Sequence, residues 1–257
     1  MSKPILEVDT VGVRFGGIIA LNGVSFNMQE GHIVGLIGPN GAGKTTLFNC
    51  LSRLYVPNEG DIRFRGETIL NSPPHHIAEL GIGRTFQNLA LFQTMSVLEN
   101  VMVGGHSTTK SSYFENFLPL PWVKREEDEL RERAAELLNY LGLSGVAHEP
   151  VGGLPFGTQK RVELARALVA EPKLLLLDEP MAGMNVEEKE DMSRFILDVN
   201  DEFGTTIALI EHDMGVVMDL SDRVVVMDYG KKIGDGTPDE VRSNQEVIDA
   251  YLGVSHD

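Results

Sequence analysis

The sequence predicts an α/β fold whose core is a mostly parallel sheet. Four apolar runs, within 32–38, 173–180, 205–213 and 223–230, lack alternation and are typical of strands buried on both faces. Helical patterns, among them the segment 186–203, separate these runs along the chain. Strands that alternate with helices in this way favour a parallel sheet.

An antiparallel β subdomain is expected beside this core. Segments 5–15 and 20–28 alternate apolar and polar residues, which indicates two half-buried antiparallel strands. The segment 60–69 has the pattern of another short hairpin strand. These segments flank the apolar run at 32–38, so that the N-terminal part of the chain combines both kinds of sheet.

A helical subdomain is expected to interrupt the core. Segments 96–104 and 125–143 have helical patterns, and residues 107–124 between them, with two prolines and the only tryptophan, are interpreted as an insertion. The second helix has apolar residues spaced for one face, namely Leu130, Ala134, Leu137, Leu138 and Leu141. The predicted organisation is a single domain over 1–257, with the core and its antiparallel β subdomain at about 1–90 and 166–257 and the helical subdomain at about 91–165.

The composition narrows the class of protein. A length of 257 residues with 42% hydrophobic and 23% charged residues fits one large globular α/β domain. The net charge of −16 disfavours binding to nucleic acid, whose phosphates attract basic proteins. The one cysteine, Cys50, cannot form an intramolecular disulfide and is expected to be a buried helix residue in a reducing compartment. The longest apolar run, Leu174–Leu177, is too short to span a bilayer, so any role at a membrane requires a partner.

A glycine-rich loop follows the first buried run. Its sequence, GPNGAGKT over Gly38–Thr45, fits the pattern G-x-x-x-x-G-K-[ST] between a strand and a helix, a context that disfavours a chance match. Gly41 and Gly43 allow the backbone to turn its N–H groups toward phosphate oxygens, and the helix N-terminus adds partial positive charge. Lys44 can reach the β- and γ-phosphates, and the Thr45 hydroxyl can bind Mg²⁺. The loop therefore predicts a site for a nucleotide with Mg²⁺.

Two carboxylates follow the second apolar run. Asp178 and Glu179 are expected at the carboxyl edge of a buried strand, next to the phosphate-binding loop. Asp178 suits a water-mediated contact with Mg²⁺, and Glu179 suits the polarisation of an attacking water. An apolar run that ends in Asp-Glu is weak evidence alone, but it becomes strong evidence beside the phosphate-binding loop.

The order of the motifs resembles the nucleotide-binding subunits of ATP-binding-cassette (ABC) transporters over essentially the full length. The resemblance rests on GPNGAGKTT, RTFQNLALF, LPFGTQKR, LLLLDEP, AGMN and IEHDM, in that order. It implies a P-loop NTPase of ABC type in which residues 1–257 form one ATPase domain. It further implies that two subunits enclose two ATP molecules with Mg²⁺.

The resemblance implies roles for three more side chains. Gln87 is similar to the glutamine that reaches Mg²⁺ and the attacking water, although a lone glutamine there is otherwise an ordinary exposed residue. His212 is similar to the histidine that contacts the γ-phosphate, with a structural histidine as the alternative. Phe15 lies where the family has an aromatic residue that stacks on adenine, with a strand-end core residue as the alternative.

The signature segment of the family, usually Leu-Ser-Gly-Gly-Gln, corresponds here to Leu154-Pro155-Phe156-Gly157-Thr158. In the family it caps the ATP held by the opposite subunit. Loss of the serine hydroxyl removes a bond of about 1.5–3 kcal/mol, whereas proline is favoured at a first helical position, which is where we expect Pro155. We interpret the segment as altered but active, with a degraded site as the alternative. The implied nucleotide contacts are Asn40, Gly41, Ala42, Gly43, Lys44, Thr45, Thr46, Leu154, Pro155, Gly157 and Thr158.

Subfamily features resemble the ATPases of branched-chain amino acid importers. They are the turn Ala182-Gly183-Met184-Asn185, where many ABC proteins have Ser-Ala-Leu-Asp, and the segments RFGGIIALNGVSF, GIGRTFQNLALFQTMSVLENV and VIDAYLG. Lipopolysaccharide-export and urea-import ATPases share several of these features. Other classes remain open: an ABC ATPase without a transporter, a monomeric P-loop enzyme such as a kinase, and a subunit that binds nucleotide without hydrolysis.

The resemblance also implies partners and a location. The ATPase would pair with a second copy or a homologous subunit and with integral membrane permease subunits, and indirectly with a periplasmic solute-binding protein, at the cytoplasmic face of the inner membrane. A permease helix would insert near Gln87, with Leu91, Phe92 and Met95 as candidate apolar walls or, equally, as subdomain core.

Overall fold

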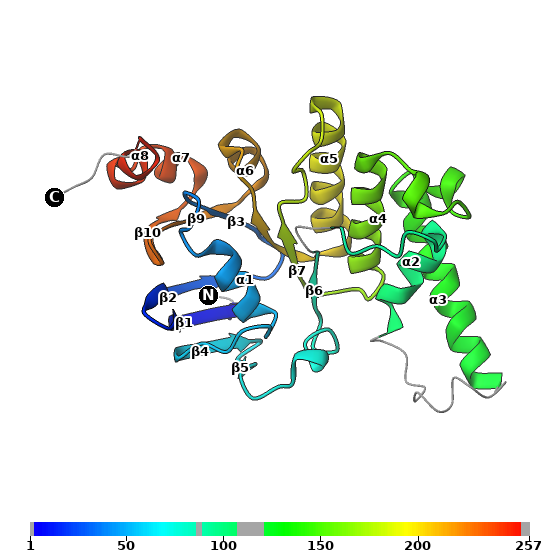
Figure 1. Ribbon diagram of the computed structural model, residues 1–257, viewed down its shortest axis with the longest axis horizontal. Coiled ribbons are helices and arrows are strands. Elements are labelled where there is room, and N and C mark those ends of the chain that lie inside the picture. Colours follow the sequence, from blue (N-terminus) through cyan, green and yellow to red (C-terminus); the bar gives the residue numbers. More distant parts are fainter. Residues whose placement is uncertain (1–2, 86–88, 107–120, 253–257) are drawn as a thin grey trace.

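Two β-sheets and several layers of helices form an α/β structure, as predicted (Figure 1). The computed structural model describes residues 3–85, 89–106 and 121–252. The larger sheet has six strands in the order β10-β9-β3-β8-β7-β6, and the smaller sheet has four in the order β2-β1-β4-β5.

The six-stranded sheet is parallel except at one edge. Its parallel strands are β3 (Ile33–Ile37), β6 (Ile82–Arg84), β7 (Leu174–Asp178), β8 (Thr206–Ile210) and β9 (Arg223–Asp228). The edge strand β10 (Lys231–Gly236) pairs antiparallel with β9. Every residue of β3, β7 and β8 is buried, which confirms the prediction from their continuous apolar runs.

The four-stranded sheet is the predicted antiparallel subdomain. It consists of β1 (Leu6–Phe15), β2 (Ile18–Met28), β4 (Glu59–Phe64) and β5 (Glu67–Thr68). The predicted hairpin at 60–69 is the β4–β5 pair, in which Phe64 faces Glu67. The predicted alternation holds only in part of β1, because Val11, Gly12 and Val13 are all buried where register shifts interrupt its pairing with β2.

The two faces of β7 belong to different hydrophobic cores. Leu174 and Leu176 pack into the core shared with the four-stranded sheet and α1 (Lys44–Leu51). Leu175 and Leu177 pack into the core shared with the helices on the other face. Cys50 of α1 is fully buried, as predicted, and burial raises the pKa of its thiol to about 11.

Helices α2 (Val97–Gly104), α3 (Pro121–Tyr140) and α4 (Phe156–Leu168) pack against one another at one end of the molecule (Figure 1). They are the predicted helical subdomain, although its boundaries at about 91 and 165 stay a prediction. Residues 121–124, including Trp122, belong to α3, so the expected insertion ends within this helix, and its being an insertion stays a prediction. Proline is tolerated in the first helical turn, where its missing N–H has no partner. The rest of the expected insertion, 107–120, lies outside the described residues.

The remaining helices cover the core sheet. Helix α5 (Val186–Phe203) begins after Asn185, which forms a capping box with Glu188, and ends at Gly204 in a left-handed conformation with φ +61°. The others are α6 (Met214–Leu220), α7 (Pro238–Arg242) and α8 (Gln245–Leu252). None of the helices in the described ranges has the length and apolar composition needed to cross a bilayer.

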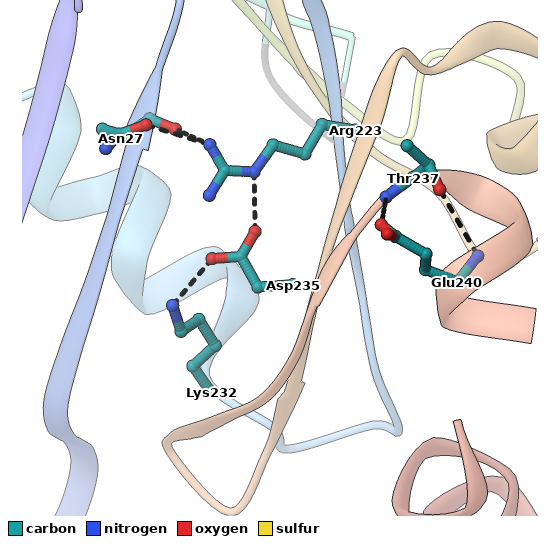
Figure 2. Close-up of polar contacts among 6 residues, drawn as sticks. All are labelled: Asn27, Arg223, Lys232, Asp235, Thr237 and Glu240. Atoms are coloured by element: carbon teal, nitrogen blue, oxygen red, sulfur yellow. Dashed lines mark hydrogen bonds and ion pairs between the residues drawn. The ribbon is translucent and has the colours of Figure 1, made fainter. Parts of the chain in front are cut away.

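A network of charged side chains joins the two sheets (Figure 2). Arg223 of β9 donates from Nε to Asp235 Oδ1 at 2.6 Å and from Nη1 to the backbone carbonyl of Asn27 in β2 at 3.0 Å. Lys232 donates to the other Asp235 oxygen at 2.7 Å. Burial alone would raise the pKa of Asp235, but the hydrogen bonds from Arg223 and Lys232 outweigh it and lower the pKa.

The variant Asp235→Asn (D235N) should lose about 1.5–3 kcal/mol of unfolding free energy at pH 7, because hydrogen bonds to a charged group disappear. Since the folded pKa is lowered, the carboxylate stabilises the protein above its unfolded pKa of about 3.9. This stabilisation is lost as the pH falls through the folded pKa, so the two proteins should converge in acid. Urea unfolding at several pH values measures the difference. The control Asp219→Asn changes a carboxylate that is 82% exposed, and it should have almost no effect.

Candidate nucleotide-binding site

The loop after β3 has the backbone conformation that phosphate binding requires. Gly41 and Gly43 have φ of +84° and +99°, which confirms the predicted bends. A side chain at Gly43 would also meet the backbone carbonyl of Ala20, only 2.6 Å from an added Cβ. The loop is therefore closely packed against β2 while Asn40, Gly41 and Thr45 remain exposed to solvent.

Lys44 lies over this loop as the first residue of α1. Its Nζ donates to the backbone carbonyls of Gly38 at 2.6 Å and Pro39 at 3.0 Å. Burial lowers the pKa of its ammonium group, and the charges of Glu179 and Asp178 act in the opposite direction. The ammonium is thus held between the loop and the two predicted carboxylates, where it can exchange a carbonyl for a phosphate oxygen.

Asp178, the last residue of β7, forms a buried ion pair. Its Oδ2 accepts from Arg84 Nη2 at 2.9 Å, and the two side chains are only 1% and 8% exposed. Its other oxygen, Oδ1, is buried and has no hydrogen-bond partner among the described residues. Burial raises the pKa of Asp178 although Arg84 opposes this shift. A cation or a water bound to it would satisfy Oδ1.

The fit of this site to Mg²⁺ follows from its ligands. Mg²⁺ usually binds one or two protein oxygens and completes its shell with phosphate oxygens and water. Within the described ranges no group of three or more His, Cys, Asp or Glu could hold a metal alone. Asp178 and the exposed hydroxyl of Thr45 provide the kind of oxygens that a nucleotide-bound Mg²⁺ needs.

Glu179 and His212 are brought into direct contact. His212 Nε2 and Glu179 Oε1 lie 2.7 Å apart, although 33 positions separate the two residues in sequence. Glu179 has the unusual φ of +52°, and its N–H donates to the carbonyl of Ile210 at 2.9 Å. The turn aims the carboxylate at the end of β8, and the His212 side chain, 48% exposed, covers it from the solvent side.

Two further residues of the site were not predicted. Arg84 of β6 also donates to Asn49 Oδ1 at 2.8 Å and Ser52 Oγ at 2.6 Å, and so ties Asp178 to α1. Glu211 accepts from the backbone N–H of Met181 at 2.8 Å, and burial raises the pKa of its carboxyl. The only sequence signals were that Arg84 lies close to Gln87 in the same motif and that Glu211 precedes His212.

The other predicted site residues have different surroundings. Phe15 is 47% exposed and contacts the ring of Tyr55 with a centroid distance of 5.2 Å, so it is not a core residue. Ala42 is buried and Thr46 is half-buried. Gln87 lies outside the described residues. Of the candidate walls, Leu91 is buried in the helical core, whereas Phe92 is 51% exposed.

The signature segment begins helix α4. Pro155, with φ −54° and ψ 150°, is the N-cap residue and Phe156 is the first helical residue, so the expected first helical position of Pro155 is wrong by one. Proline cannot provide the side-chain cap that serine would. The N–H groups of Phe156, Gly157 and Thr158 have no acceptor among the described residues, and they can bind an anion. Leu154 accepts from Gln159 Nε2 at 2.8 Å.

Helix α1, which follows the P-loop, and helix α4, which begins at the signature segment, lie apart within one chain. Figure 1 shows β7 and α5 between α1 and α4. One chain therefore presents the P-loop and the signature segment on different parts of its surface.

Comparisons with known proteins agree with this geometry. Residues 21–182 match the family model described as ABC transporter, and residues 231–257 match the model described as branched-chain amino acid ATP-binding cassette transporter. The high-affinity branched-chain amino acid transport ATP-binding protein BraF of Pseudomonas aeruginosa is 45% identical over 98% of this chain and 99% of its own. The corresponding LivG protein of Salmonella typhimurium is 44% identical over the same shares.

Solved structures are similar as well. The ADP conformation of an ATP-binding cassette of an ABC transporter superimposes with a TM-score of 0.84 at 32% identity, over 98% of this chain and 100% of that one. A dimeric post-hydrolysis state of an ATP-binding cassette, bound to ADP and Pi, superimposes with a TM-score of 0.76 at 25% identity, over 91% of this chain and 98% of that one.

Proposed function

Because this chain belongs to the ABC transporter ATP-binding family, we propose that it is the ATP-hydrolysing subunit of an importer for branched-chain or other hydrophobic amino acids. The observation that carries the proposal is the 2.7 Å contact between Glu179 and His212 at the edge of the sheet that also presents Asp178 and the P-loop. The substrate class is supported by the names of the relatives and by the match over residues 231–257.

Each side chain has a role in hydrolysis. Lys44 and the N–H groups of residues 40–46 neutralise the β- and γ-phosphates, while Phe15 stacks on adenine. Glu179 accepts a proton from the attacking water, and His212 holds the Glu179 carboxylate in place and contacts the γ-phosphate. Asp178, Thr45 and Gln87 would hold Mg²⁺, which would supply neutralisation of charge on the phosphates. Catalysis of this kind consists mainly of positioning and charge neutralisation.

The working unit is a dimer with a second copy or a homologous subunit. The unpartnered N–H groups at the start of α4 cap the γ-phosphate held by the other subunit, together with Leu154, Pro155, Gly157 and Thr158. The separation of α1 from α4 within one chain supports this arrangement, as does the dimeric relative.

Permease subunits bind at the side of the helical subdomain. The exposed ring of Phe92, close in sequence to Gln87, is the apolar contact that we assign to a permease helix. The ATPase then lies at the cytoplasmic face of the inner membrane, and a periplasmic solute-binding protein acts on the same transporter without contact to this chain.

The function is tested with the full chain, its permease subunits and a solute-binding protein in proteoliposomes. ATP hydrolysis should be coupled to uptake of labelled leucine, isoleucine or valine, and urea should not be taken up. Hydrolysis without uptake of any hydrophobic amino acid would contradict the substrate class, and an absence of hydrolysis would contradict the proposed activity.

The variant Pro155→Ser (P155S) should raise turnover by about tenfold, because the restored hydroxyl adds a charge-assisted hydrogen bond to the nucleotide. The free energy of unfolding should hardly change. The serine cap adds about 1 kcal/mol, but the unfolded chain gains conformational entropy when proline is removed, and this offsets the gain. Phosphate release and urea unfolding measure both quantities. The control Pro238→Ser, in the first turn of α7, should leave turnover unaltered. Unchanged or lower turnover in P155S would mean that the missing hydroxyl does not limit hydrolysis.

A further inference from the structure

The beginning of α4 touches the turn that follows Glu179. The Phe156 ring lies against Gly183, so that a Cβ added to Gly183 would be 3.0 Å from Phe156 Cε1 and 3.5 Å from Cζ. One residue on, a Cβ added to Gly157 would overlap the carboxylate of Glu188 in α5. A carbon added at Gly157 would require the Glu188 carboxylate to move, and one added at Gly183 would be tighter against the ring than an ordinary van der Waals contact.

The two residues in contact differ in size from those of the usual family segments, and one is larger while the other is smaller. Phe156 stands where the usual signature has glycine, and Gly183 stands where the usual turn has alanine. A large ring thus replaces a small residue on one side, and a smaller residue is present on the other. In this chain the large ring and the glycine lie against each other at the contact between α4 and the turn.

The turn that carries Gly183 is joined to Glu179 by its own hydrogen bonds. Ala182 donates from its N–H to the Glu179 carbonyl at 3.2 Å, and Met184 donates to the Met181 carbonyl at 3.2 Å. Met181 and Met184 are buried, and Glu211 holds the Met181 N–H. These bonds connect the turn that carries Gly183 to the backbone of Glu179, the residue whose carboxylate faces His212.

Burial does not account for the position of Phe156. Its side chain is 44% exposed, and the ring has the ammonium of Lys160 at 5.9 Å from its centroid. Lys160 itself is only 3% exposed, so the ring bridges a buried charge of α4 and the surface of the turn. An exposed aromatic ring held in this way can act as a rigid contact between two segments.

We propose that Phe156 is a positioning residue that couples the signature segment to Glu179 of the same chain through Gly183. This inference rests on the proposed function, because the force on Phe156 comes from nucleotide held by the other subunit. When that nucleotide is enclosed, α4 presses the ring on the turn and Glu179 is held in its hydrolytic position. Each subunit would then hydrolyse its ATP only when its signature segment is occupied.

The test is a double-mutant cycle of Phe156→Ala and Gly183→Ala in the full-length chain. Phe156→Ala should lower kcat by about tenfold, because a small misplacement of a catalytic group has an effect of that size or larger. Equilibrium ATP binding and the melting temperature should stay near wild-type values, since the P-loop and the cores are untouched. Gly183→Ala should also lower kcat, and it should cost less in the Phe156→Ala background because the clash with the ring is gone.

The control Gly204→Ala separates the clash from backbone strain. Gly204 has φ +61°, comparable to the +81° of Gly183, but nothing lies within 4 Å of its added Cβ. It should reproduce the stability loss of Gly183→Ala and leave kcat unchanged. Equal losses of kcat from Gly183→Ala in both backgrounds, or a wild-type kcat in Phe156→Ala, would overturn the coupling. A wild-type chain that does not hydrolyse ATP would instead overturn the proposed function.

Discussion

Replacing Glu179 with glutamine (E179Q) should reduce ATP hydrolysis by about 10²–10⁴-fold while ATP binding is retained. The amide has the same shape as the carboxylate but cannot accept a proton from the attacking water. The P-loop and Lys44 are unchanged, so nucleotide still binds, and the two subunits should remain closed around it. Phosphate release measures the first effect, and size-exclusion chromatography with ATP detects the stable dimer.

The same chemical change elsewhere in the chain provides the control. Glu187 is exposed in the first turn of α5, and Glu187→Gln should alter neither hydrolysis nor dimerisation. If E179Q hydrolysed ATP at the wild-type rate, a group other than Glu179 would activate the water. The contact with His212 would then have a structural purpose only.

Replacing Arg84 with methionine (R84M) should destabilise the protein by about 3–5 kcal/mol, because it leaves the buried Asp178 carboxylate without its cation. Burial already raises the pKa of Asp178 in the wild-type protein. Protonation removes the uncompensated charge, so the deficit of R84M should be largest at neutral pH and shrink as the pH falls. Urea unfolding across pH measures both expectations, and hydrolysis should fall as well because Asp178 loses its orientation.

A solvent-exposed ion pair serves as the comparison. Arg14 and Glu59 lie 3.3 Å apart, but their side chains are 57% and 64% exposed. Arg14→Met should therefore cost only about 0–1 kcal/mol. Equal losses from the two substitutions would mean that burial of the Arg84–Asp178 pair has no energetic consequence.

The elements with strong local signals were predicted well. Helix α5 has the predicted bounds because Asn185 caps its beginning and Gly204 ends it. Strands β6 and β10 were missed, since the first has three residues and the second, KKIGDG, lacks an apolar run. Both are strands because a neighbouring strand offers hydrogen-bond partners, which a sequence pattern does not reveal.

The residues of the site also separate into those with a local sequence signal and those that depend on distant partners. The bends at Gly41 and Gly43 follow from a local motif, and Asp178 ends its strand as predicted. Arg84 and Glu211 were missed, because their partners lie 94 and 30 positions away. The position of Pro155 was wrong by one residue, since proline is compatible with both the N-cap and the first helical position and only ψ distinguishes them.

The opposite orientations of the leucines in β7 have a consequence for divergence of the sequence. Leu174 and Leu176 contact one core, and Leu175 and Leu177 contact the other. A substitution that changes side-chain volume in the four-stranded sheet is therefore compensated by substitutions at Leu174 or Leu176. A substitution that changes side-chain volume in the helices is compensated at Leu175 or Leu177. The two halves of the molecule can accumulate substitutions separately over evolutionary time, although adjacent peptide units of a single strand support them both.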